Sequence, residues 1–97
     1  MPVRPLAAED FDRIIDYSVE HFPAQAARMA HELLDAFERL DAMPTIGNPR
    51  DDLLPGCRTW RVRSFIVVYR PVDSGVEILR IAHGRQLVEA IALAEEL

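Results

Sequence analysis

The feature that most constrains the fold is a pair of apolar, β-branched segments separated by a short turn. Residues 65–70 read FIVVYR and residues 76–83 read VEILRIAH, compositions that favour strands. The intervening residues 71–75, PVDSG, are typical of a tight turn. We therefore expect the two segments to pair as an antiparallel hairpin. Residues 57–63 also alternate, which predicts a third strand joined tightly to the second near Ser64.

The N-terminal part of the chain has a helical period instead. Apolar or small residues recur at three- and four-residue intervals across residues 7–22, which predicts an amphipathic helix. They are Phe11, Ile14, Ile15, Ser18 and Phe22. Glu9 and Asp10 are expected on the solvated side, in the first turn, where the helix dipole favours acids. Pro23 is expected to end this helix.

Pro23 also suits the first position of a second helix, because the opening N–H groups of a helix have no internal partner. The predicted buried stripe of this helix consists of Ala26, Ala30, Leu33, Leu34, Phe37 and Leu40. The link between the helices is short. We therefore expect an antiparallel helical hairpin.

Prolines and glycines interrupt the pattern between residues 41 and 56, which predicts a long loop without a regular strand ladder. Its tip at residues 48–52 is a candidate contact surface, since long loops in compact domains tend to be functional. A short edge strand is possible at residues 2–5, and a short helix at residues 86–97.

These elements predict an α+β fold in which an N-terminal helical hairpin packs on a small antiparallel sheet of three to four strands. The 97 residues suit one domain, residues 1–97, because two cores would each be too small. Apolar residues make up 49% of the chain and charged residues 28%, which supports a packed core rather than disorder.

The composition also narrows the functional class. A formal charge of −5 argues against non-specific binding to nucleic acid. We expect a cytoplasmic protein without membrane association, because no apolar run approaches the roughly 20 residues of a membrane span and no signal peptide is evident. Cys57 is alone and cannot form an internal disulfide. His21 and His31 lack a second ligand at metal-binding spacing, so no metal or cofactor is expected.

The order of the segments, together with their residue sequences, resembles that of a known family. The helical segments AAEDFDRIIDY and FPAQAARMAHELLDAFERL are followed by the loop MPTIGNPRDDLLPGCR and by the strands RTWRV, FIVVYRP and VEILRIAHG. Over nearly its whole length this chain resembles the ParE branch of the RelE/ParE toxin superfamily. The most specific parts are LPGCR at residues 54–58 and ILRIAHGR at residues 78–85.

The resemblance implies the toxin of a bacterial type II toxin-antitoxin pair, held inactive by a cognate antitoxin. ParE-like members are associated with poisoning DNA gyrase, whereas RelE-like members cut messenger RNA on the ribosome. An antitoxin of this kind has a disordered C-terminal part that folds on contact, laying an apolar helix or strand along the helical hairpin and sheet. An exposed sheet edge, the arginine-bearing face and the C-terminal tail are expected to contact the target. Direct DNA binding is expected only through the antitoxin.

Ribonucleolytic cleavage needs cations for the phosphate and a group that transfers protons. Arg61 and Arg63 are two residues apart on one predicted strand and should share a face, Arg80 is a candidate third cation, and His83 is the nearest proton-transfer group. His83 and Arg80 have opposite parity on a regular strand, so this site needs a bulge or a strand end. The sequence therefore favours a protein without catalytic activity over a nuclease.

The leading hypothesis is a binding-type toxin without catalytic residues. The alternatives are a ribosome-dependent endoribonuclease and a non-toxic interaction module of the same fold. The candidate residues for binding the target or the antitoxin are Arg58, Arg61, Arg63, Arg80, His83, Arg85, Leu87 and Ile91.

Overall fold

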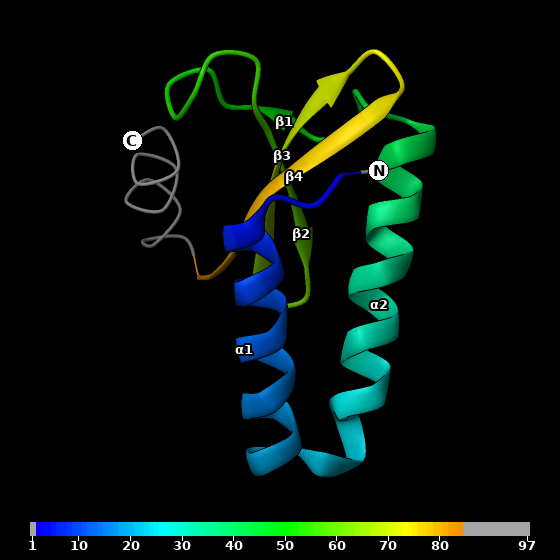
Figure 1. Ribbon diagram of the computed structural model, residues 1–97, viewed down its shortest axis with the longest axis vertical. Helices are drawn as coiled ribbons and strands as arrows, with labels where there is room; N and C mark the ends of the chain where they lie inside the picture. The colour runs from blue at the N-terminus through cyan, green and yellow to red at the C-terminus, as the bar shows by residue number, and fades with distance from the viewer. Residues whose placement is uncertain (1, 85–97) are drawn as a thin grey trace.

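A computed structural model describes residues 2–84 of the chain. Two helices lie side by side and pack on a four-stranded sheet (Figure 1). In chain order the elements are α1 (Pro5–His21), α2 (Pro23–Ala42), β1 (Asn48–Pro49), β2 (Arg58–Val62), β3 (Phe65–Val72) and β4 (Gly75–His83). The predicted α+β architecture is confirmed. The helix predicted at residues 86–97 lies outside the described residues.

The sheet is an antiparallel meander in the order β1-β2-β3-β4. The two apolar segments pair as predicted, with Phe65 opposite His83 and Val67 opposite Ile81. The register shifts between Val68 and Tyr69, so that Leu79 is the extra residue of a β-bulge in β4. The sequence pattern therefore fixed the pairing of β3 and β4 but did not locate this bulge.

The prediction that residues 41–56 form no regular ladder is wrong at two positions. Asn48 pairs with Thr59 and Pro49 with Arg58, which makes β1 a short edge strand. A proline is tolerated there because an edge strand does not need every N–H in the ladder. Side chains of Arg58 and Tyr69 also bind the preceding part of the loop to the sheet through hydrogen bonds.

The start of α1 also differs from the prediction. The helix begins at Pro5, two residues before the predicted start, and Pro5 occupies the first helical position. Glu9 and Asp10 consequently lie beyond the first turn, which contains no acidic residue. The proposed interaction of these two acids with the helix dipole is therefore wrong. The second helix begins at Pro23, as predicted.

The main core lies between the helices and the sheet. It contains Ala7, Leu33, Ala36, Phe37, Leu40, Val62, Val67, Tyr69, Val76, Ile78 and Ile81. A smaller cluster lies on the other face of the sheet, formed by Leu53, Leu54, Cys57, Ile66, Val68, Leu79 and Ala82. The loop before β2 supplies the first three of these residues, so the loop covers part of that face. Leu34, predicted to be buried, is 47% exposed.

Tyr69 fixes the loop that leads to β1. Its buried phenol donates a hydrogen bond to the carbonyl oxygen of Pro44 at 2.8 Å and accepts one from the Gly47 amide at 2.9 Å. A Cβ atom at Gly47 would lie 2.5 Å from the Tyr69 hydroxyl, so the close approach requires glycine. Burial raises the pKa of Tyr69, which keeps the phenol protonated and able to donate.

The outer edge of β4 is covered, so this strand does not supply the exposed sheet edge that the sequence analysis expects. The N-terminal segment runs parallel to the strand: the Ile78 amide donates to the Pro2 carbonyl at 3.0 Å and the Arg4 amide to the Ile78 carbonyl at 2.9 Å. This is the short strand anticipated at residues 2–5, reduced to a single bridge between Val3 and Ile78.

Two carboxylates cover further positions of the same edge. Asp41, at the end of α2, accepts a hydrogen bond from the Val76 amide at 3.1 Å. Asp10 accepts one from the Ile81 amide at 2.9 Å. Side-chain acceptors therefore replace a neighbouring strand along β4, which lowers the tendency of this edge to pair with another chain. Neither helix among residues 2–84 is long and apolar enough to cross a membrane.

The carboxylate of Glu77 should make stability depend on acid pH. A hydrogen bond from Arg70 at 2.6 Å, together with the charges of Arg70 and Arg4, lowers the pKa of Glu77 below 4.5. The stabilisation is present above the unfolded-state pKa and is lost as the pH falls through the folded-state pKa. At about pH 7 we expect Glu77→Gln to cost about 1 kcal/mol or less.

Urea unfolding of the protein and of the Glu77→Gln variant at about pH 7 and about pH 3 tests this expectation. The difference in unfolding free energy between the two proteins should shrink at the lower pH, because the stabilisation by charged Glu77 is progressively lost as the pH falls toward its lowered folded-state pKa. A difference that stays constant over this range would contradict the assignment.

Candidate functional site

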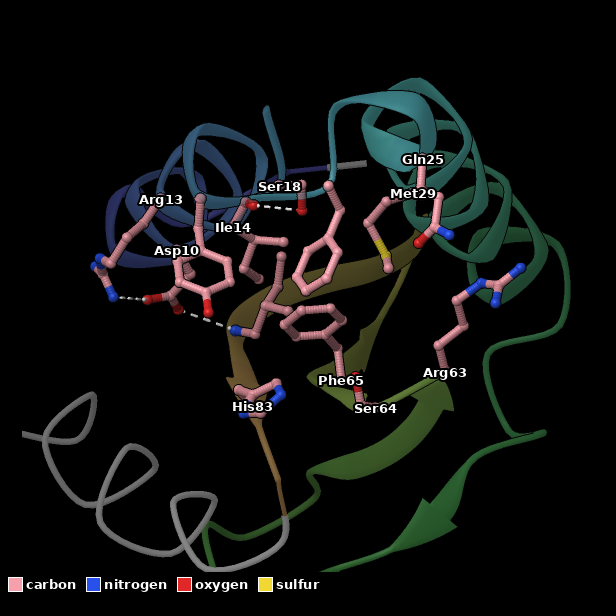
Figure 2. A pocket seen from close by; sticks show the side chains of 13 residues that line it. Asp10, Arg13, Ile14, Ser18, Gln25, Met29, Arg63, Ser64, Phe65 and His83 are labelled. Carbon is pink, nitrogen blue, oxygen red and sulfur yellow. Dashed lines mark hydrogen bonds and ion pairs between the residues drawn. The ribbon is translucent and has the colours of Figure 1, made fainter. Parts of the chain in front are cut away.

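An open groove lies where the end of the helical hairpin overhangs the sheet. Figure 1 shows both helices extending past the turn that joins β2 to β3. The groove has a volume of about 670 Å³. Figure 2 shows helical side chains on one side of it and side chains of β3, β4 and the β2–β3 turn on the other. Its apolar lining consists of Ile14, Tyr17, Phe22, Met29, Phe65 and Ile81.

Aromatic rings at the end of the hairpin are exposed to solvent. Tyr17 is 56% exposed and Phe22 is 53% exposed. The ring of Tyr17 stacks on His21 with centroids 4.2 Å apart. Exposed aromatic surface beside a groove is typical of a protein-binding site, because covering it removes apolar area from water.

The opposite side of the groove contains Phe65 and His83, which face each other across β3 and β4. Their rings meet edge to face with centroids 5.1 Å apart, as Figure 2 illustrates. His83 is exposed at the end of β4. Its imidazole therefore lies at the groove surface, where a bound partner can reach it.

Arg63 lies at the mouth of the groove but not on a strand. It occupies the β2–β3 turn with a φ of 55°, so the prediction that Arg61 and Arg63 share one strand face is wrong. Its guanidinium pairs with Glu32 of α2. The hydrogen bond from Arg63 lowers the pKa of Glu32, and the same contact raises the pKa of Arg63, so both groups are charged near neutral pH.

Asp10 forms the most buried charged contact in the groove wall. Its carboxylate is 2% exposed and receives two hydrogen bonds from Arg80, at 2.7 and 3.0 Å, in addition to the one from the Ile81 amide. Arg13 lies 3.4 Å away. The prediction that Asp10 is solvated is therefore wrong. Its spacing gave a signal, since Asp10 is three residues after Ala7 and four before Ile14.

The four residues of the nuclease hypothesis are not gathered into one site. Arg80 is held by Asp10 and its side chain is 12% exposed. Arg61 pairs in register with Ile66 of the smaller cluster, which places it on the sheet face away from the helices. Arg63 and His83 both line the groove. The described geometry thus brings together two of the four candidates.

Of the remaining candidate contact residues, only Arg58 lies within the described part of the chain. Arg58 donates hydrogen bonds to the carbonyl oxygens of Thr45 at 3.0 Å and Gly47 at 2.8 Å, so it holds the loop before β1. Arg85, Leu87 and Ile91 lie outside the described residues. Ile14 and Phe22, which line the groove, were assigned in the sequence to the apolar stripe of the first helix, because periodicity does not separate a core contact from a groove contact.

A helical hairpin on an antiparallel meander, with an apolar groove and arginines at its rim, defines a small α+β domain suited to binding another protein. The chain belongs to the ParE toxin family: the family model described as the ParE toxin of the type II toxin-antitoxin system, parDE, matches residues 3–88. The resemblance inferred from the sequence is thereby confirmed.

Individual relatives agree with this assignment. The chain is 36% identical to Toxin ParE3 of Caulobacter vibrioides over 90% of this chain and 87% of the relative. It is 30% identical to Toxin ParE1 of Mycobacterium tuberculosis, over 88% and 89% of the two chains. A chain of the chromosomal ParDE TA system from P. aeruginosa has the same fold, with a TM-score of 0.71, 26% identity, and coverage of 88% of this chain and 97% of that one.

Proposed function

We propose that this protein inhibits bacterial growth by binding DNA gyrase in the cytoplasm and that a cognate antitoxin neutralises it. The membership of residues 3–88 in the ParE toxin family carries the proposal. The relative of known structure belongs to a ParDE TA system, which supports an antitoxin as the partner of this chain.

The groove between the hairpin and the sheet is the proposed antitoxin site. Its lining combines exposed aromatic rings with Arg13, Arg63 and His83. An amphipathic segment of a partner can bury apolar side chains in such a groove. Arg63 and His83 are proposed as antitoxin contacts, while Arg61, Arg85, Leu87 and Ile91 are proposed contacts of the target or the antitoxin. Arg58 and Arg80 are proposed to support those contacts by holding the loop and α1.

Induced expression tests the biological role. Expression of this chain alone should stop growth and trap gyrase on cleaved DNA, and co-expression of the protein encoded by the adjacent reading frame should restore growth. Primer extension on cellular messages provides the counter-test: new cuts at codon positions would favour the endoribonuclease alternative. Normal growth in the presence of soluble, folded protein would favour the non-toxic interaction module.

Two matched substitutions test the groove as the antitoxin site. Tyr17 lines the groove, whereas Leu34 is comparably exposed on α2 and is not part of the groove lining. Tyr17→Glu should weaken binding of the purified antitoxin by about tenfold or more, or about 1.4 kcal/mol, because it places a charge against apolar surface. Leu34→Glu should leave affinity within about twofold. Equal effects of the two substitutions would rule out the groove.

A further inference from the structure

We propose that Arg63 selects a carboxylate on the antitoxin and that Glu32 holds its guanidinium until the antitoxin binds. This inference rests on the proposed function and deepens it, because it names the chemistry that the groove recognises. The partner segment is expected to place an apolar side chain in the groove and an acidic side chain on Arg63.

The backbone at Arg63 gives the first argument. A φ of 55° is the left-handed region, which disfavours residues with a Cβ and suits glycine or asparagine. A turn that only had to reverse the chain would form at lower cost with either of those residues. The strained turn instead directs a long cation to the mouth of the groove, as Figure 2 shows. An outlier of this kind is consistent with a binding role.

The ion pair itself gives the second argument. The side chains of Arg63 and Glu32 are 51% and 35% exposed. Exposed ion pairs contribute little to stability. A carboxylate from a partner can therefore replace Glu32 at small cost, and the replacement contact becomes stronger where the bound segment excludes water. The contact with Glu32 keeps the guanidinium oriented in the free protein.

The charge around the groove identifies the occupant. The chain carries a net charge of −5, yet Arg13, Arg63 and His83 line the groove. The carboxylate in the same lining, Asp10, is buried and accepts hydrogen bonds from Arg80 and Ile81. Arg13 also lies 3.4 Å from Asp10, so the guanidinium that remains at the groove mouth for a partner is that of Arg63, whose side chain is 51% exposed beside the apolar lining. An amphipathic helix with an apolar side chain and an Asp or Glu three or four residues away has the complementary pattern.

Two single substitutions should change affinity in opposite directions. Arg63→Gly removes the guanidinium and relieves the backbone, so binding of the purified protein from the adjacent reading frame should weaken by about tenfold or more. Glu32→Gln releases Arg63 from its internal partner and should strengthen the same binding by roughly threefold. Isothermal titration calorimetry at low and at moderate salt measures the affinity of each variant. Arg63→Gly should also reduce the salt dependence of binding.

A purely structural role for the pair predicts a different result. Both substitutions break the same ion pair, so they would then change stability and binding in parallel. Urea unfolding of each variant measures stability separately, and we expect Arg63→Gly to unfold no more easily than the wild type. A double variant, Arg63→Glu with Glu32→Arg, restores an internal pair but should still bind the antitoxin weakly.

Arg70→Gln is the matched control, because it breaks another ion pair, with Glu77, that is partly exposed and lies outside the groove. It should leave affinity unchanged. Wild-type affinity for Arg63→Gly would overturn the inference while leaving the proposed function intact. Absence of binding between the wild-type chain and the adjacent-frame protein would overturn both.

Discussion

Replacing Asp10 with alanine is expected to lower the free energy of unfolding by roughly 3–5 kcal/mol, the usual cost of removing one partner of a buried ion pair. The substitution removes the carboxylate that accepts two hydrogen bonds from Arg80, whose side chain is 12% exposed, and a third from the Ile81 amide. Chemical denaturation followed by circular dichroism measures this loss.

Two further variants distinguish the effect of losing the Asp10 charge from the effect of losing an acidic residue elsewhere on the same helix. Asp16→Ala changes an exposed acid on the same helix and should alter stability by no more than about 0.5 kcal/mol. Asp10→Asn keeps an oxygen for the Ile81 amide but removes the charge opposite Arg80, so its effect should fall between those of the two alanine variants. If Asp10→Ala were as mild as Asp16→Ala, the buried pair would not be important for stability.

Removing the hydroxyl of Tyr69 should have the second large effect. Tyr69→Phe leaves the Pro44 carbonyl and the Gly47 amide without their hydrogen-bond partner, which is expected to cost about 1–3 kcal/mol. The same exchange at Tyr17 is the control, because that side chain is 56% exposed and should tolerate the loss.

Thermal unfolding of both phenylalanine variants gives the comparison. Hydrogen exchange adds a local readout, since the Gly47 amide should exchange faster in Tyr69→Phe. Unchanged protection of Gly47 would show that the phenol does not hold this loop.

The sequence predicted the elements whose pattern repeats over several residues. β3 and β4 were predictable because each is an apolar β-branched run, and PVDSG left a single short connection between them. The two helices were predictable from their apolar stripes and from Pro23. The strand β1 was missed because its two residues, Asn48 and Pro49, have no strand propensity, and only pairing with β2 makes them a strand.

The candidate site was less predictable because it depends on contacts between distant segments. Asp10 looked like a solvated acid because its partner, Arg80, is far away in the sequence. Arg63 was assigned to a strand because alternation does not reveal where the chain turns. The groove forms where the hairpin extends past the sheet, and relative lengths of packed elements are not encoded in a local pattern.

The contact between Asp10 and Arg80 joins residues 70 positions apart in the chain. During synthesis, the ribosome therefore releases the carboxylate long before it releases the cation that neutralises it. A nascent or truncated polypeptide that ends before Arg80 cannot bury Asp10 without a large desolvation cost. Docking of α1 is thus postponed until β4, which carries Arg80, has been synthesised, so the groove wall is completed only after the last strand of the sheet is available.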